Sequence, residues 1–322
     1  MPLSLSLGYD TIVGVALPFL GAASGFAGAF FNPFTVGIAQ GIAGLPLYSG
    51  LGYRLIVWAV GTAIVIAIVM RYAARILKNP KLSLTYEEDL EKRQKLQVGG
   101  PVIAKLPLTA AHIGVLVVFA LGFVVMVIGI LVKHWFIYEI GGVFLAMGIL
   151  AGIVGGLKGD VFGKAFVDGA KDMINAALII GTARAILIVA QDGKILDTIL
   201  AGMAGAISQF NPVISAQIMF VSQCVINFFV HSGTAQAALT IPIMAPLGDL
   251  VGITRQTSVF AFQLAEYINP VLPTSGVTMG VLALAGLRWE KWARWLVPLL
   301  ILWVLFAALA LIPPVLMKWG PA

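Results

Sequence analysis

Long apolar runs alternate with short polar connections along most of the chain. The clearest runs are about 20 residues long, which is enough to cross the hydrocarbon core of a bilayer as an α-helix. We predict such spans at residues 52–70, 111–132, 136–156, 173–190 and 295–317. The pattern therefore predicts an all-α polytopic membrane protein.

Two further apolar stretches are interrupted by the same dipeptide, Asn-Pro. Proline cannot donate a backbone hydrogen bond, and the carbonyls freed by such a break are tolerated at membrane depth only inside protein or beside a wet cavity. Paired interruptions of this kind are typical of the discontinuous helices of secondary transporters. The polar residues of the interruptions are Asn32, Pro33 and Thr35 in the first and Glu266, Asn269, Pro270, Thr274 and Ser275 in the second.

Between these stretches, two short apolar arms at 213–231 and 235–247 flank a small polar tip. Arms of this length predict a re-entrant hairpin that opens to the outside rather than two crossings. We expect its hydroxyl groups, side-chain amide and half-helix N–H groups to point at a carboxylate. Helix packing by small residues is the alternative. The tip residues are Ser232, Gly233, Thr234 and Gln236.

The spacing of landmarks indicates an internal repeat. Pro2 to Gly8 is spaced like Pro242 to Gly248, and an Asn-Pro pair follows each. The two copies would cross the bilayer in opposite directions. This predicts inverted repeats built from re-entrant hairpins and discontinuous transmembrane helices.

The polar connections predict the topology. The loop at 71–105 carries eight basic residues, so the positive-inside rule places it in the cytoplasm. Residues 158–172 mix charged and apolar positions, which predicts a helix on the cytoplasmic surface. Three tryptophans are expected to be interfacial anchors: Trp289, Trp292 and Trp295.

Composition excludes several function classes. Apolar residues make up 60% of the chain and charged residues only 11%, whereas a soluble domain has about half apolar and a quarter charged residues. The net charge of +6 resides mostly in connecting segments, so no nucleic-acid partner is expected. The single Cys224 excludes an internal disulfide and a multi-cysteine metal site. Phosphate-loop, nucleophile-elbow and zinc signatures are absent from the sequence, so we expect no enzyme activity, no cofactor and no resident metal.

Several of these stretches together carry a resemblance that covers nearly the whole chain. They include residues 25–40 (GFAGAFFNPFTVGIAQ), 227–256 and 272–276 (LPTSG). The chain resembles the YfcC-like branch of the DcuC (anaerobic dicarboxylate carrier) family of the ion transporter superfamily. The resemblance implies a multi-pass protein of the cell (inner) membrane that is a homodimer at full length.

Two departures from the family pattern stand out. Family members are usually longer at the N-terminus, so we expect this chain to start in the second arm of the first hairpin, as a fragment or from a misplaced start. A genuinely shortened protein is the alternative. Relatives tend to have Gly-Asp-Gly where this chain has Ala265-Glu266-Tyr267, which puts the shape or ion preference of that site in question.

We therefore divide the chain into five parts. They are the second hairpin arm with the first broken helix (1–50), a transmembrane helix with the cytoplasmic loop (51–110), scaffold helices with an interfacial helix (111–194), the second re-entrant hairpin with the second broken helix (195–294), and a C-terminal transmembrane helix (295–322).

The predicted function is ion-coupled secondary transport or exchange of a small carboxylate-bearing solute by alternating access. The solute is an amino acid, including basic ones, or a short dicarboxylate, and Glu266 inclines the prediction to a cationic amino group. Substrate binding is assigned to Ser232, Gly233, Thr234, Gln236, Asn32, Thr35, Asn269, Thr274 and Ser275. Coupling to Na⁺ or H⁺ is assigned to Asn32, Pro33, Glu266, Asn269 and Pro270, with Na⁺ bound only transiently.

Other interpretations stay open at this point. A channel, an intramembrane enzyme and an inactive fragment are the rival classes. Arg184 is interpreted either as a ligand of the substrate carboxylate or as a structural counter-ion of Asp10 or Asp197. His231 either packs beside the tip or titrates during transport.

Overall fold

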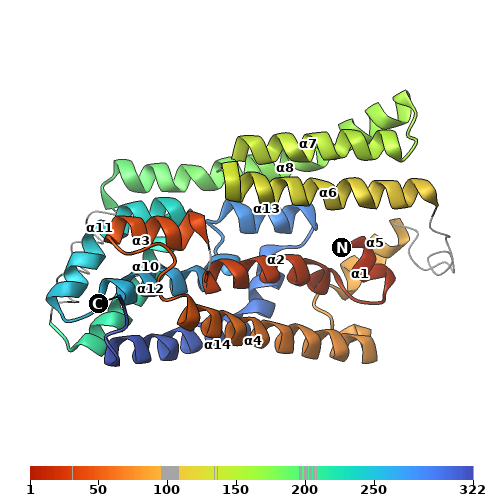
Figure 1. Cartoon of the computed structure of the whole chain (residues 1–322). Coiled ribbons are helices and arrows are strands. Elements are labelled where there is room, and N and C mark those ends of the chain that lie inside the picture. Colours follow the sequence, from red (N-terminus) through yellow and green to blue (C-terminus); the bar gives the residue numbers. More distant parts are fainter. Residues whose placement is uncertain are drawn as a thin grey trace. The chain divides into compact units, whose positions relative to one another are not determined.

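The computed structural model describes residues 1–321 except Phe31, 96–108, His134, Phe136, 196, 197, 199–201, 203, 204, 206 and 208. Every regular element in these residues is helical (Figure 1). The chain forms two compact units, one of Met1–Val98 with Asn175–Ala322 and the other of Gly99–Ile174.

The smaller unit contains a pair of apolar helices. These are α6 (Ala110–Lys133) and α7 (Ile137–Val154), and they pack through aromatic rings such as Phe123 and Phe144, whose centroids are 6.3 Å apart. Most apolar side chains of α6 are exposed, as expected of a helix that faces lipid. His134, in the connection between these helices, lies outside the described residues.

The next helix differs from its prediction. The interfacial helix expected at 158–172 and the span expected at 173–190 are one continuous helix, α8 (Gly159–Asp192). This segment contains no proline, and exposed charged side chains do not interrupt a helix.

The larger unit has two sets of helices, from the beginning and the end of the chain. The first set is α1 (Pro2–Ser6), α2 (Thr11–Gly28), the π-helix η1 (Pro33–Gly37), α3 (Ile38–Ala43), α4 (Leu51–Lys78), the 3₁₀ turn η2 (Pro80–Leu82) and α5 (Tyr86–Lys95). The second set is α10 (Pro212–Phe229), α11 (Gly233–Leu250), α12 (Arg255–Leu264), the 3₁₀ segment η4 (Ala265–Val271), α13 (Gly276–Leu284) and α14 (Trp289–Leu316).

Five described helices are long and apolar enough to cross a membrane: Thr11–Gly28, Leu51–Lys78, Ala110–Gly129, Pro212–Phe229 and Trp289–Leu316. The predictions of spans at 52–70, 111–132 and 295–317 are thereby confirmed. The run at 136–156 forms a shorter apolar helix, Tyr138–Val154. The chain is a multi-pass membrane protein.

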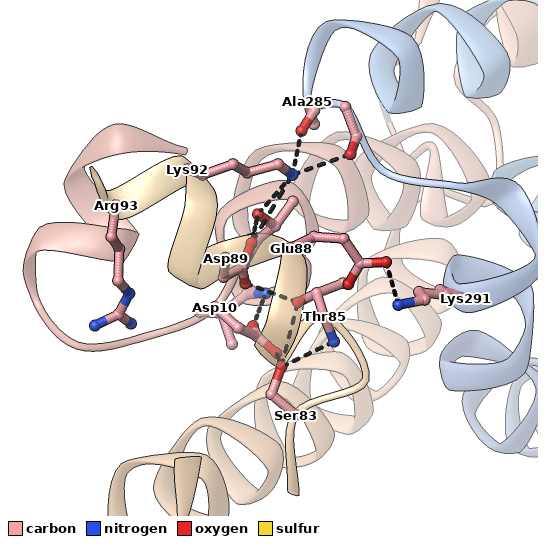
Figure 2. A network of polar contacts seen from close by, with 12 residues as sticks. Asp10, Ser83, Thr85, Glu88, Asp89, Lys92, Arg93, Ala285 and Lys291 are labelled. Atoms are coloured by element: carbon pink, nitrogen blue, oxygen red, sulfur yellow. Dashed lines mark hydrogen bonds and ion pairs between the residues drawn. The ribbon is translucent and has the colours of Figure 1, made fainter. Parts of the chain in front are cut away.

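The predicted loop at 71–105 contains α5, which is bound to the ends of two other helices (Figure 2). Asp89 accepts hydrogen bonds from the backbone N–H of Thr11, at 2.7 Å, and from its hydroxyl. Lys92 Nζ donates to the carbonyls of Ala285 and Gly286, just past α13, at 2.9 and 3.0 Å. An acidic group at the first turn of α2 and a cation beyond the last turn of α13 both match the helix dipoles.

Further contacts complete this α5 network. Asp10 is the N-cap of α2 and also accepts hydrogen bonds from Tyr72 and Ser83, at 2.6 and 2.7 Å. Glu88 pairs with Lys291 at the start of α14, and the hydrogen bond from that ammonium lowers the pKa of the Glu88 carboxyl group. Burial lowers the pKa of Lys92. Helix α5 is therefore a packed element rather than a solvated loop.

Replacing Lys92 by methionine is expected to destabilise the fold. The change keeps the length of the side chain but removes its bonds to two carbonyls and its ion pair with Asp89. Loss of a partner by buried polar groups costs about 1–3 kcal/mol. The free energy of unfolding in detergent measures the effect, and Lys81→Met, at an exposed position of the same loop, is the matched control. Equal stability of the two variants would contradict the role given to Lys92.

Candidate functional site

The turn between α10 and α11 touches both interrupted stretches. Gly233 begins α11 and is buried. A Cβ atom at this position would lie 2.5 Å from Thr35 Cγ2 in η1 and 3.2 Å from Glu266 Oε1 in η4. Three segments that are distant in sequence therefore meet at one point, and only glycine permits so close an approach.

The first interruption is stabilised by the second half of the chain. Helix α2 ends at Gly28, where the ring of Trp58 lies so close that a Cβ atom would be 2.4 Å from it. The Gln263 side chain donates to the carbonyls of Ala27 and Gly28, at 3.0 and 2.6 Å. In η1, the carbonyl of Asn32 accepts a bond from Gly37 N at 3.0 Å. Gln263 thus satisfies carbonyls that the end of α2 leaves free.

The second interruption is organised around Asn269. Its side-chain oxygen accepts a bond from the Ser275 hydroxyl at 2.9 Å, and its backbone carbonyl accepts one from Thr278 at 2.9 Å. Its amide nitrogen donates to the carbonyl of His231 in the α10–α11 turn, at 3.3 Å. The predicted site residue Asn269 therefore joins η4, α13 and the turn.

Tryptophans of α14 complete the second interruption. Trp292 Nε1 donates to the carbonyl of Pro270 at 2.8 Å, and Trp289 Nε1 donates to that of Val271 at 2.9 Å. The prediction that Trp289, Trp292 and Trp295 are interfacial anchors is wrong for the last two, which are buried in the core. For Trp292 the reason is that the broken helix frees a carbonyl that needs a donor, which the indole N–H supplies, whereas Trp295 packs against the rings of Trp292 and Tyr72.

The turn between α10 and α11 comprises Val230 to Ser232, slightly earlier than predicted. Ser232 is the N-cap of α11, and its side chain accepts a bond from Ala235 N. Thr274 donates to the carbonyl of Phe228, just before the turn, at 2.5 Å. These contacts fix the turn against the second interruption.

Gln236, a predicted ligand of the substrate, joins the two arms of the turn instead. Its amide nitrogen donates to the backbone carbonyl and side-chain oxygen of Gln223, at 2.9 and 2.8 Å. Its side-chain oxygen accepts a bond from Asn227 at 2.9 Å. Within the described residues its polar groups are therefore used by α10.

Several buried oxygens around this junction have no hydrogen-bond partner among the described residues. They are Thr35 Oγ1, Glu266 Oε1, Asn227 Oδ1 and Gln263 Oε1. Asn227 lies beside the Glu266 carboxyl group, and Asn269 Nδ2 lies 3.5 Å from Glu266 Oε2. Buried polar groups are nearly always paired, so unpaired ones require an explanation. One carboxylate with several neutral oxygens suits a bound cation or an ammonium group.

Sequence reasoning missed two residues of this junction, Asn227 and Gln263. Asn227 lies in a stretch that carried the family resemblance and Gln263 lies just before the second interruption, but a single sequence does not indicate which of these positions face one another. The side chain of Arg184 and the whole of Asp197 lie outside the described residues. His231 is half-buried, with Nδ1 3.3 Å from the carbonyl of Asn227.

Comparison with known proteins assigns the family. The family model of the C4-dicarboxylate anaerobic carrier, DcuC, matches residues 1–316. The chain belongs to the DcuC family. This DcuC chain is 40% identical over 305 residues to the putative basic amino acid antiporter YfcC of Escherichia coli K12, covering 90% of this chain and 60% of that protein. It is 34% identical over 298 residues to an uncharacterized protein of Haemophilus influenzae, covering 90% of this chain and 58% of that protein.

The chain spans about 60% of the length of the curated relatives it matches. No solved structure matches the chain. DcuC proteins are membrane carriers and not enzymes. This confirms the predicted family and the prediction that the chain belongs to a transporter family.

The close approach at Gly233 is expected to be sensitive to one added methyl group. Gly233→Ala would place a Cβ atom against the Thr35 methyl group and should impair transport and lower thermal stability. Thr35→Ser removes that methyl group and keeps the hydroxyl, so the double variant should recover part of the loss. Uptake and unfolding temperature measure both effects. Wild-type behaviour of Gly233→Ala would mean that the three segments do not meet in the functional protein.

Proposed function

We propose that the chain belongs to an ion-coupled secondary transporter or exchanger of a small carboxylate-bearing solute, working by alternating access. The observation that carries the proposal is the Glu266 carboxyl group. It is buried at the junction of the α10–α11 turn with both interruptions, and its Oε1 has no hydrogen-bond partner among the described residues. An acidic side chain inside a membrane protein is costly to maintain, so a role in moving an ion or substrate is its expected explanation.

In this proposal α10 and α11 form a re-entrant hairpin, and the two interrupted stretches belong to inverted repeats. Support comes from the order of elements, since in each half a helix is followed by a non-α segment with Asn-Pro and then by a short helix. By length and composition α10 could also cross a membrane by itself, so the re-entrant course stays a prediction.

The charge of the junction favours an amino acid over a dicarboxylate. Glu266 attracts a cationic group, and Thr35, Asn227 and Gln263 add neutral oxygens. The name of the E. coli relative, a putative basic amino acid antiporter, agrees with an amino acid that carries an extra cationic group. A short dicarboxylate is the second candidate because of the family description. If the substrate is an amino acid, Glu266 contacts it directly. If the substrate is a dicarboxylate, Glu266 binds Na⁺ or carries H⁺.

The remaining proposals concern the whole protein. The carrier is placed in the cell (inner) membrane with the 71–105 segment in the cytoplasm. The full-length protein is expected to be a homodimer. Substrate contacts are proposed for the residues at the junction, and Asn269 and Gln236 act mainly by holding its segments together.

Glu266→Gln tests the proposed site. The substitution keeps the shape of the side chain and removes its charge. We expect exchange of lysine, arginine or ornithine in proteoliposomes to fall at least tenfold, because a desolvated cation loses its counter-charge, and a paired charge contributes about 1.5–3 kcal/mol. Glu290→Gln, at an exposed position at the start of α14, is the control. Unchanged exchange in Glu266→Gln, or wild-type transport of succinate but of no amino acid, would overturn the proposed substrate class.

The topology is tested by labelling. Lys81→Cys in a Cys224→Ser background places one thiol at an exposed position of the 71–105 segment. A membrane-impermeant maleimide should label it in inside-out vesicles and not in intact cells. Labelling from the outside of intact cells would reverse the proposed orientation.

A further inference from the structure

One buried cation in the larger unit has no part in the site described above. Arg54 lies near the beginning of α4, inside the predicted span at 52–70, and its side chain is fully buried. All three guanidinium nitrogens, Nε, Nη1 and Nη2, lack a hydrogen-bond partner among the described residues. Buried arginines are normally paired with an acid or with several carbonyls, so this arrangement is unusual.

Two aromatic rings that contact each other adjoin the guanidinium group, with their centroids 5.5 Å apart and their planes at 73°. The Arg54 Cζ atom lies 5.4 Å from the ring centroid of Phe260 in α12 and 5.4 Å from that of Trp319, beyond α14. Cation–π contacts stabilise the positive charge when the cation lies over the face of an aromatic ring. The five N–H donors lie in the plane of the group and point outward from its edge. Neither ring offers a hydrogen-bond acceptor, so these donors stay unpaired among the described residues.

The nearby polar groups do not supply that acceptor. Three polar side chains use one another as hydrogen-bond partners. Gln40 Nε2 donates to Ser49 Oγ at 3.1 Å, and Ser49 Oγ donates to Gln256 Oε1 at 3.1 Å. Asp249, an acid of the same unit, pairs with Arg255 at 2.7 Å. Within the part of the chain that the structure describes, no ion pair includes Arg54.

The location of Arg54 relates it to the candidate site. Gly61 comes seven residues after Arg54 in α4 and lies against Tyr267. A Cβ atom at Gly61 would be 2.3 Å from the hydroxyl oxygen of Tyr267. Tyr267 follows Glu266 and comes seven residues after Phe260. Helix α4 therefore contacts Phe260 near its beginning, through Arg54. Two turns further along, which is roughly 10 Å, it contacts Tyr267, the residue next to Glu266.

We propose that Arg54 binds the carboxylate of the transported solute, at a subsite about two turns along α4 from the contact between Gly61 and Tyr267, the neighbour of Glu266. The planar guanidinium group matches a carboxylate with two parallel hydrogen bonds, and its nitrogens have no partner among the described residues. The solute's cationic group is then the one that Glu266 attracts. This inference rests on the proposed transport of a carboxylate-bearing solute.

Trp319 covers the subsite. Its ring lies over Arg54, and its carbonyl accepts a bond from Thr254 at 2.5 Å. Because Arg54 is fully buried, a carboxylate reaches it only when a neighbouring group moves away, and we assign this movement to the ring of Trp319. In an alternating-access cycle, this segment after α14 opens and closes one side of the path.

The experiment compares solutes with and without a carboxylate. Binding of lysine and of its decarboxylated analogue cadaverine is measured by calorimetry on the purified full chain in detergent. Wild-type protein should bind lysine about 10- to 100-fold more tightly, since only lysine makes the charge-assisted pair. In Arg54→Gln the two affinities should become similar, through a loss for lysine and little change for cadaverine. Arg75→Gln, at an exposed position of the same helix, should leave the preference intact.

If Arg54→Gln does not fold, Arg54→Lys tests the role of Arg54 in carboxylate binding. It keeps the charge but not the fork of donors, so the preference for lysine should fall without vanishing. Tight binding of lysine by the wild type, together with an unchanged preference in the Arg54 variants, would overturn this inference and leave the proposed function standing. Failure of the wild type to bind lysine at all would overturn both.

Discussion

A helix that is interrupted inside a membrane protein leaves backbone carbonyls that lipid cannot satisfy, and the larger unit is organised around supplying donors to them. The end of α2 receives two bonds from Gln263. In the second interruption, the carbonyl of Asn269 receives a bond from Thr278, and that of Pro270 receives one from Trp292. Each donor comes from another part of the chain or from the next helix. The interruptions are therefore stable only when the helices around them are packed.

The hydrogen bonds that hold the interrupted segments together determine which polar groups remain available for a ligand. Asn269 and Gln236 have polar groups that the protein itself uses, and they hold the turn between α10 and α11 against its neighbours. Thr35 and Glu266 both lie close to Gly233 and retain unpaired oxygens among the described residues. The distinction between residues that build the junction and residues that face a solute thus follows from hydrogen-bond accounting.

The other charged positions of the larger unit can also be compared by whether each charge has hydrogen-bond partners. Helix α5 places Asp89 at the start of α2 and Lys92 beyond the end of α13, where each charge opposes a helix dipole and has several partners (Figure 2). Arg54 differs, because two aromatic rings stabilise its charge while its donors lack partners in the described part of the chain. A charge that the protein leaves incompletely satisfied is the one expected to meet a charge from outside.

The sequence by itself determined the class of protein, the main helices and the places where helices break. The apolar runs of α4, α6 and α14 are long enough for a bilayer, and proline cannot donate within a helix, so local chemistry sufficed. Family membership followed from motifs along the chain, and the match over residues 1–316 confirmed it. Only the tertiary structure decided that Trp292 is buried rather than interfacial, that Asp89 binds the first turn of α2, and that Arg54 adjoins the rings of Phe260 and Trp319. Each of these facts joins residues far apart in sequence, and hydropathy and spacing report only on neighbours along the chain.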